Sequence, residues 1–146
     1  MNMDSFNKDY KEGREIEEKI LKVVRKKYPK AKLSEGNVPE FDLFIPEISK
    51  TVEIKFDRLA EKTDNFAIEV EFDDRPSGLE GTTADFWLIY FNKVAYLLET
   101  ESLRYLVRES KRKRFVFGGF EKKSKLVLIP VEEIIFSAYT VEWKVE

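Results

Sequence analysis

Hydrophobic and polar positions follow two different periods along this 146-residue chain. Between Asp9 and Lys27, apolar residues recur every three or four positions, which is the spacing of an amphipathic helix. Beyond Pro39, short apolar runs either alternate with polar residues or are continuous, as β-strands are. The predicted strands cover 41–45, 51–56, 66–72, 86–91, 94–98, 115–117 and 126–129, and a strand-like tail follows over 138–145.

Turn and helix signals divide these strands into blocks. A segment rich in Pro and Gly over 73–83 predicts turns, and Asn92-Lys93 predicts a tight turn between two strands. Thr100 is the expected cap of a second helix over 100–109, and Pro130 is expected to open one helical turn over 131–135. No repeat or linker interrupts this order, which predicts a single α/β (α+β) domain over 1–146, with a central mixed sheet flanked by helices.

The composition narrows the possible chemistry. Hydrophobic residues make up 42% of the chain, which is enough for a packed core. The chain has no Cys and no His, which excludes disulfides, thiolate nucleophiles, histidine bases and the usual zinc sites. A metal would therefore be held by oxygen ligands, which indicates Mg²⁺, with Mn²⁺ as a substitute. We expect no small-molecule cofactor.

No apolar run approaches the roughly 20 residues that span a bilayer, and the polar N-terminus does not resemble a signal peptide. We therefore expect a cytoplasmic protein that does not contact a membrane. The net charge is −2, yet the stretch from Arg104 to Lys125 holds nine basic residues against two acidic ones. Its densest part, the basic run, is the candidate for sequence-independent contact with a DNA backbone, the alternative being an ordinary solvated helix end. The basic run consists of Lys111, Arg112, Lys113 and Arg114.

Candidate catalytic residues lie on the first two predicted strands. Asp42 stands between two apolar residues, where a carboxylate is costly unless a partner compensates it. Glu53 and Lys55 are two positions apart on the next strand and share one face, with Ile54 facing the opposite way. If the strands form a hairpin, two carboxylates and an ammonium converge, which suits metal-assisted phosphodiester hydrolysis. The plain alternative is a surface salt bridge.

Asp42, an intervening hairpin and Glu53-Ile54-Lys55 resemble the signature of the PD-(D/E)XK nuclease superfamily, although Phe41 stands where the motif has Pro. The helix that contains Gly13 and Glu17 is similar to the first helix of archaeal Holliday-junction resolvases. The resemblance implies a restriction-endonuclease-like sheet and a homodimer. It also implies that Glu17 reaches the metal site, with Glu12 and Glu15 as less favoured substitutes.

Two later segments resemble phage and mobile-element nucleases of the same superfamily. The first is the predicted strand over 65–71. The second is the loop that contains Pro76-Ser77-Gly78-Leu79 and Thr82-Thr83-Ala84-Asp85. The resemblance implies that this loop lies beside the active centre, where Ser77, Thr82 and Thr83 would donate hydrogen bonds to phosphates. Asp85 is expected to brace the loop. Whether Glu69 or Glu71 approaches the metal stays open, and a phage-encoded protein would act in the host cytoplasm.

The sequence therefore predicts a Mg²⁺-dependent DNA endonuclease with Asp42, Glu53, Lys55 and Glu17 as catalytic residues. Asp42, Glu53, Ile54 and Glu17 are the expected metal ligands. Branched or double-stranded DNA is the expected partner, and structure-selective cutting of the Holliday-junction type is favoured. The alternatives are a restriction-type or nicking endonuclease, a non-catalytic nucleic-acid-binding or assembly module, and an interaction protein with a chance Glu-x-Lys.

Overall fold

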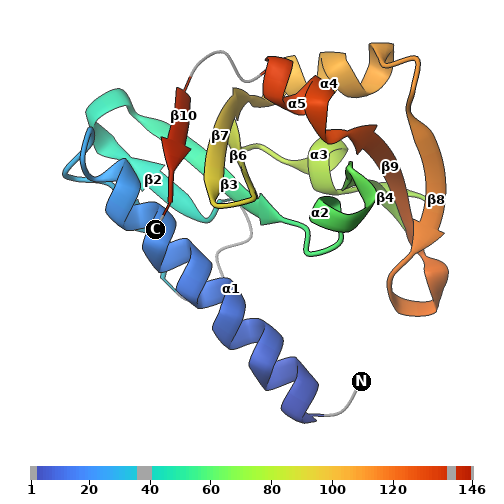
Figure 1. Ribbon diagram of the computed structural model, residues 1–146, viewed down its shortest axis with the longest axis horizontal. Coiled ribbons are helices and arrows are strands. Elements are labelled where there is room, and N and C mark those ends of the chain that lie inside the picture. The colour runs from blue at the N-terminus through green and yellow to red at the C-terminus, as the bar shows by residue number, and fades with distance from the viewer. Residues whose placement is uncertain (1–2, 36–40, 138–140, 146) are drawn as a thin grey trace.

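The computed structural model describes residues 3–35, 41–137 and 141–145, and the strands of these ranges form two sheets (Figure 1). The α-helices are α1 (Met3–Val24), α2 (Ala60–Thr63), α3 (Gly78–Gly81), α4 (Thr100–Glu109) and α5 (Val131–Ser137). The strands are β1 (Lys32–Leu33), β2 (Leu43–Ile45), β3 (Lys50–Phe56), β4 (Asn65–Phe72), β5 (Arg75–Pro76), β6 (Phe86–Phe91), β7 (Val94–Glu99), β8 (Arg114–Gly118), β9 (Ser124–Pro130) and β10 (Val141–Lys144).

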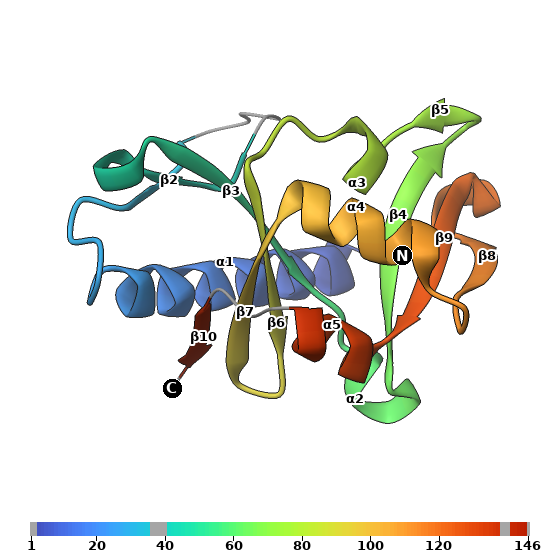
Figure 2. The ribbon, with the colours of Figure 1, turned by 90° about the horizontal axis from the view of Figure 1, so that it is seen from above.

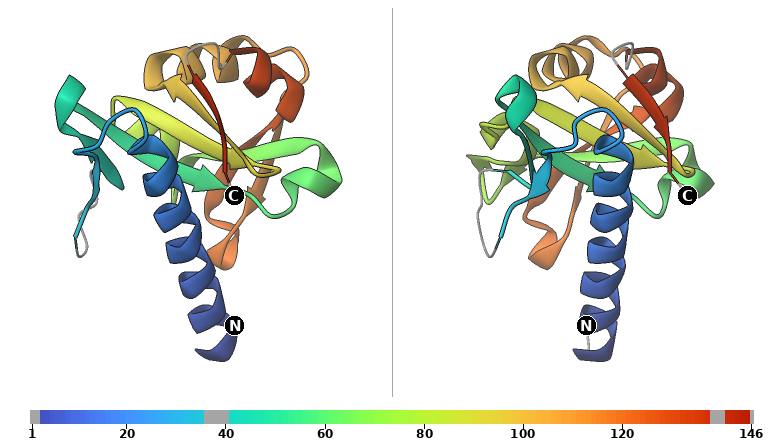
Figure 3. Two further views of the ribbon diagram at one scale, coloured as in Figure 1. Left: turned by 60° about the vertical axis from the view of Figure 1, so that its left-hand side comes forward. Right: turned by 90° about the vertical axis from the view of Figure 1, so that its left-hand side faces the viewer.

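The first sheet has the strand order β1-β2-β3-β6-β7-β10, and α1 lies across one of its faces (Figure 3). Only β3 and β6 pair in parallel, and all other neighbours in this sheet are antiparallel. Ile20 and Val24 of α1 are fully buried against this face. They pack in one core with Val52, Ile54 and Leu88, the alternate residues that point to this side of β3 and β6.

The second sheet, in the order β5-β4-β9-β8, lies beside β6 and β7 on the side away from β2 (Figure 2). Trp87 and Ile89 point toward it from the opposite face of the first sheet. They share a core with Phe66 and Ile129 of the second sheet and with Leu103 of α4. The two cores therefore sit on opposite faces of β3, β6 and β7.

The fold confirms a mixed α/β architecture with a mixed sheet flanked by helices, and each predicted strand within the described ranges is present. The expected tail strand is found at Val141–Lys144, whereas 138–140 lie outside the described residues. The division into two sheets differs from the single central sheet expected. It arises because β4 pairs antiparallel with β9, which brings Asn65 opposite Pro130. Local hydrophobic periodicity carries no information on such a distant pairing.

The expected cap at Thr100 is wrong by one position. Glu99 occupies the N-cap of α4, and no side chain caps the helix there. The Thr100 hydroxyl is buried and instead donates to the Ala84 carbonyl oxygen at 2.6 Å, so it fastens α4 to the segment before β6. The predicted Asn92-Lys93 turn is confirmed, with positive φ at both residues.

Two glycines differ in what the backbone demands of them. Gly78 has a φ of +52°, and a Cβ there would lie 2.1 Å from the Glu69 carbonyl oxygen. Gly13 lies inside α1, and a Cβ there would meet no atom within 4 Å. Packing therefore requires a glycine at 78 and does not require one at 13.

We predict opposite effects of alanine at these two positions. Gly78→Ala should lower the free energy of unfolding by at least about 2 kcal/mol, because it adds a clash to a left-handed backbone. Gly13→Ala should raise it by about 0.5–1 kcal/mol, because alanine favours the helix. Urea denaturation of both variants measures the changes, and a loss of stability in Gly13→Ala would contradict the open space around that position.

Candidate active site

The β2–β3 hairpin places Asp42 beside the middle of β3. Leu43 pairs with Val52, and the Asp42 N–H donates to the Val52 carbonyl oxygen at 3.0 Å. One carboxylate oxygen of Asp42, Oδ2, accepts the Ile54 N–H at 2.8 Å. The Asp42 side chain thus accepts the hydrogen bond that a backbone carbonyl of the neighbouring strand would otherwise accept from Ile54. This hydrogen bond holds the Asp42 carboxylate at the edge of β3.

Glu53 and Lys55 share the face of β3 that is opposite to α1, as their spacing predicted. Lys55 Nζ lies 3.1 Å from Glu53 Oε1, and the two side chains are 42% and 19% exposed. The ammonium also lies 5.6 Å from the centre of the Trp87 ring, a buried residue that pairs with Glu53 in the β3–β6 register. Lys55 is therefore held between a carboxylate and an aromatic face.

Glu17 reaches the same region from α1. It lies on the helix stripe of Gly13, Ile20 and Val24, which faces the sheet, and its side chain is 25% exposed. Arg14 donates to it at 3.0 Å. The two substitutes lie elsewhere: Glu12 pairs with Arg58, and both Glu12 and Glu15 line a hollow near the end of β3. Of the three candidate glutamates, the structure brings Glu17 toward Asp42.

The three carboxylates repel one another. Burial raises the pKa of Glu17 above its ordinary value, and the charge of Asp42 raises it further. Burial also raises the pKa of Glu53, and the charges of Asp42 and Glu17 add to this effect while Lys55 opposes it. The charge of Asp42 acts on both glutamates. Glu17, Asp42 and Glu53, called the acidic group below, therefore concentrate negative charge at one edge of β3.

The acidic group is not a ready-made chelate. Within the ranges that the structure describes, no three acidic side chains gather closely enough to hold a metal ion. The ion pair with Lys55 holds Glu53, and the hydrogen bond to Ile54 holds one Asp42 oxygen. Because the N–H and C=O of a strand residue point to the same edge, the Ile54 carbonyl lies on the Asp42 side of β3. The available donors are all oxygens.

Glu69 and Ser77 are engaged with each other in the second sheet. The Ser77 hydroxyl donates to Glu69 Oε2 at 3.0 Å, and the Ser124 hydroxyl donates to Glu69 Oε1 at 2.7 Å. Glu71 lies 4.0 Å from Lys125. These contacts give Glu69 a structural part in joining β4, the loop and β9, and neither glutamate is brought to the acidic group.

The loop before β6 fastens that strand to β3. Thr82 accepts the Ala84 N–H at 3.1 Å through its hydroxyl oxygen, and Thr83 is exposed. Asp85 Oδ2 accepts both the N–H and the hydroxyl of Thr51, at 2.9 and 3.1 Å. Asp85 therefore braces the start of the parallel β3–β6 pair, as the sequence suggested. Thr83 is the loop hydroxyl that stands most open to solvent.

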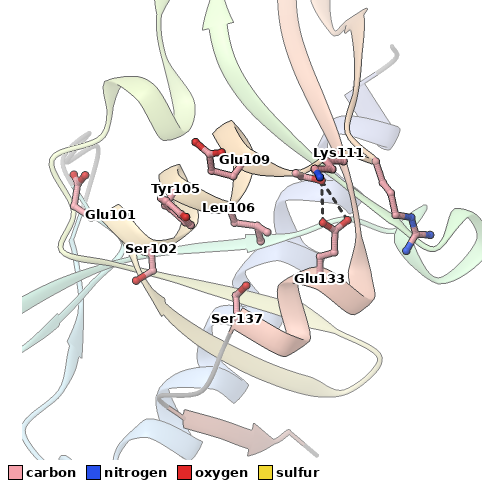
Figure 4. A pocket seen from close by; sticks show the side chains of 10 residues that line it. Glu101, Ser102, Tyr105, Leu106, Glu109, Lys111, Glu133 and Ser137 are labelled. Atoms are coloured by element: carbon pink, nitrogen blue, oxygen red, sulfur yellow. Dashed lines mark hydrogen bonds between the residues drawn. The ribbon is translucent and has the colours of Figure 1, made fainter.

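The basic run lies apart from the acidic group. Lys111 and Arg112 line a cavity of about 700 Å³ between α4 and α5, where the Ser110 hydroxyl donates to Glu133 at 2.9 Å (Figure 4). This cavity is built from different elements than the acidic group, which comes from α1 and the β2–β3 hairpin. The structure therefore does not join these two predicted parts of the site.

Two members of the basic run have partners within the protein. Arg112 forms an ion pair with Glu132. Lys113 Nζ donates to two carbonyl oxygens at the end of α4, at 3.0 and 2.6 Å, which is the usual function of a cation at a helix C-terminus. Arg114 is exposed at the start of β8. Lys111 and Arg114 stay more open to an external partner than the other two.

Sequence reasoning missed two residues that shape the site. Asp57 follows β3, and its carboxylate accepts the N–H groups of Leu59 and Ala67, at 2.9 and 3.1 Å. It ties the end of β3 to β4. Trp87 is the other, because its contact with Lys55 depends on the β3–β6 register. An aspartate directly before a turn is a signal that would have identified Asp57.

Comparisons of the chain with protein-family models, curated proteins and solved structures found no match. Among the described helices, none is both long and apolar enough to cross a membrane. The similarity to PD-(D/E)XK nucleases therefore stays a hypothesis, which depends on the residues and contacts described above.

The raised pKa of Glu53 predicts a pH-dependent effect of Glu53→Gln. A carboxyl group with a raised pKa in the folded state holds its proton more tightly there than in the unfolded chain, so its contribution to stability falls as pH rises above the ordinary value of 4.5. The variant lacks this group. Its stability relative to the wild type should therefore increase from pH 4.5 toward neutral pH and then level off.

Denaturant unfolding across this pH range measures the difference between the two proteins. Glu80→Gln, at an exposed position on α3, removes the same charge away from the acidic group and serves as the control. A pH-independent difference between Glu53→Gln and the wild type would show that no repulsive carboxylate group exists at β3.

Proposed function

We propose that this protein is a Mg²⁺-dependent DNA endonuclease that hydrolyses phosphodiester bonds at the acidic group and Lys55. The observation that carries the proposal is the position of Asp42. Its carboxylate is fastened to Ile54 on β3 and repels Glu17 on α1 and Glu53 on β3. Charge that accumulates in this way costs free energy in the folded protein, and a bound cation would offset it.

The donor set fits a hard divalent ion. Asp42 and Glu53 would hold Mg²⁺ or Mn²⁺, with the Ile54 carbonyl and Glu17 as further oxygen ligands. When bound, the ion supplies polarisation of the phosphate and acidification of water. Since the acidic group is not a preformed chelate, Glu53 would have to leave its ion pair with Lys55 to take this part.

Lys55 has the position of a group that stabilises charge. Its ammonium is partly exposed, next to Glu53 and over Trp87. An ammonium released from Glu53 would face the phosphate, orient the attacking water and stabilise the negative charge that develops on the phosphate oxygens. Glu53 therefore cannot pair with Lys55, as observed, and hold the metal ion at the same time.

The resemblance to Holliday-junction resolvases supports a structure-selective endonuclease that acts as a homodimer on branched DNA. A restriction-type or nicking enzyme would use the same residues. A phage source and a cytoplasmic site of action belong to the same hypothesis.

A second candidate is a non-catalytic nucleic-acid-binding or assembly module. It is favoured by the absence of a three-carboxylate metal group within the described residues and by the ion pair that occupies both Glu53 and Lys55. In such a module the Glu-Lys pair would be a structural contact on β3. Metal binding and cleavage separate the two candidates.

We predict that Lys55→Ala lowers the rate of Mg²⁺-dependent cleavage by at least about 10²-fold, the usual effect of removing a group that stabilises transition-state charge. Linear, flapped, nicked and four-way DNA are incubated with Mg²⁺ or with EDTA, and the products are resolved on denaturing gels. Lys62→Ala, at an exposed position on α2, is the matched control. Equal cleavage by wild type and Lys55→Ala would remove Lys55 from the mechanism, and no cleavage of any substrate by the wild type would favour the non-catalytic module.

We also predict that Asp42→Ala abolishes weak binding of Mn²⁺, because Asp42 is the carboxylate common to both repulsive pairs. Titration calorimetry with Mn²⁺ alone measures the affinity. Asp64→Ala, in the turn between α2 and β4, controls for the loss of one carboxylate. Unchanged Mn²⁺ affinity in Asp42→Ala would place any metal elsewhere on the protein.

A further inference from the structure

The second half of α1 and the segment after it form a surface of unusually uniform charge. From Lys19 to Lys32 the chain holds seven basic residues and no acidic one, although the whole protein has a net charge of −2. All seven are exposed. We call them the basic band, which consists of Lys19, Lys22, Arg25, Lys26, Lys27, Lys30 and Lys32.

A lysine from the other end of the chain joins this surface. Lys144 of β10 lines a hollow of about 240 Å³ together with Lys19, Lys22 and Lys26 of α1, and Val23 forms the apolar remainder of the lining. No carboxylate lines this hollow among the residues that the structure describes. Four lysines therefore line one small space, and the like charges of their side chains favour a bound anion nearby.

The lysines of the basic band are not paired with carboxylates among the described residues, although Lys27 and Lys32 lie over the rings of Tyr28 and Phe44. Across the described ranges, none of the six forms an ion pair with an acidic side chain, whereas Arg25 donates to the Ala31 carbonyl oxygen at 2.8 Å. Glu12 and Glu15 line a hollow with Lys19, and Glu18 lines another with Lys19 and Lys22, yet none of the three is within ion-pair distance of a described lysine of the band. Glu47 accepts the backbone N–H of Lys30 at 2.8 Å. The charge of the band is thus available to an external ligand.

Stabilisation of the helix end does not explain the number of cations. The helix dipole favours basic residues only within about the last turn. Lys19 lies more than a turn before Val24, the last residue of α1, and Lys30 and Lys32 lie beyond it. The dipole accounts for Lys22 in the last turn of α1, whereas Arg25 donates to the Ala31 carbonyl oxygen beyond the helix. The number of cations in the band therefore exceeds what the helix end needs.

The basic band leads to the strand that carries the proposed active site. Its last member, Lys32, lies on β1 over the Phe44 ring of β2, with Nζ 5.9 Å from the ring centre. Two residues later, the Ser34 N–H donates to the Asp42 carbonyl oxygen at 2.9 Å. The band therefore extends from the last turns of α1 to β1, two residues before the contact with Asp42, and Lys144 of β10 lies beside its first members.

We propose that the basic band binds the sugar-phosphate backbone of the nucleic acid on which the protein acts. This inference depends on the proposed function for the identity of the polyanion. Lys19 and Lys22 are about 4.5 Å apart along the axis of α1 at 1.5 Å per residue, close to the roughly 3.4 Å at which one DNA strand presents its phosphates along the duplex axis. Lys26 follows in the turn beyond Val24, so the three lysines can meet neighbouring phosphates.

An anionic membrane fits this surface less well. A helix that lies in a membrane interface inserts an apolar face. The apolar stripe of α1, with Ile20 and Val24, is already buried against the first sheet, and Val23 is only 7% exposed. From Lys19 to Val24 the exposed side of α1 offers charge without apolar anchors, and the exposed Tyr10 lies more than two turns earlier. This is the pattern of backbone recognition on nucleic acid.

The test compares two triple variants with the same net charge. Lys19→Gln/Lys22→Gln/Lys26→Gln removes three of the four charges that line the hollow, and Lys62→Gln/Lys93→Gln/Lys122→Gln removes three exposed charges elsewhere. Fluorescence anisotropy measures binding of a labelled duplex and a labelled four-way junction at several NaCl concentrations in EDTA, and vesicles containing phosphatidylserine are measured in parallel. Because EDTA prevents metal-dependent cleavage, binding is read independently of catalysis.

Each phosphate contact contributes about 0.9 to the slope of log affinity against log salt concentration on duplex DNA. We expect the slope to become less steep by about 2 to 3 in the band variant and to stay unchanged in the control variant. The proposal would be overturned if the slope changed equally in both variants or stayed unchanged in the band variant. It would also be overturned if the wild type bound no DNA, or if the band variant lost only its binding to vesicles. Lysine-dependent binding without cleavage in Mg²⁺ would keep it and reject the endonuclease.

Discussion

The hydrogen bond from the Ile54 N–H to the Asp42 carboxylate is the contact on which the candidate site depends. It fixes one carboxylate at the edge of β3 with a charge-assisted bond of 2.8 Å. The hairpin supplies the register, since Leu43 pairs with Val52 and leaves Asp42 level with the residues that follow. Because this carboxylate is fixed, its negative charge acts on Glu53 of β3 and on Glu17 of α1.

The charges on α1 differ between its two sides. Glu17 lies on the stripe that faces the sheet and adds to the acidic group, whereas Lys19 and Lys22 of the basic band are exposed to solvent, as are the lysines of the band that follow the helix. A phosphodiester is an anion and would be repelled by the acidic group alone. A cation held by that group, together with a nearby lysine surface, would give such a substrate a favourable field in both places.

The sequence predicted the local parts of this structure well. Period-two alternation identified β3 and β4, the Asn92-Lys93 pair identified the turn between β6 and β7, and the helical spacing of apolar residues identified α1. Each of these depends on neighbours close in the chain. The hairpin between β2 and β3 is equally local, which is why the approach of Asp42 to Glu53 was predictable.

The remaining features depend on pairings between distant segments. The β4–β9 pairing creates the second sheet and engages Glu69 with Ser124, and the β3–β6 register places Trp87 under Lys55. The basic run is recognisable in the sequence because its four cations are consecutive. The basic band is spread over a helix and interrupted by buried residues, so its common exposed surface emerged only from the fold together with Lys144.

The central claim is that the acidic group holds a hard divalent cation. A crystal of the protein soaked in Mn²⁺ and measured at a wavelength where manganese scatters anomalously tests it directly. The account predicts an anomalous peak about 2.0–2.3 Å from carboxylate oxygens of both Asp42 and Glu53, with Lys55 displaced from Glu53. A fully soaked crystal with no peak there, and with the Glu53–Lys55 ion pair intact, would contradict the account.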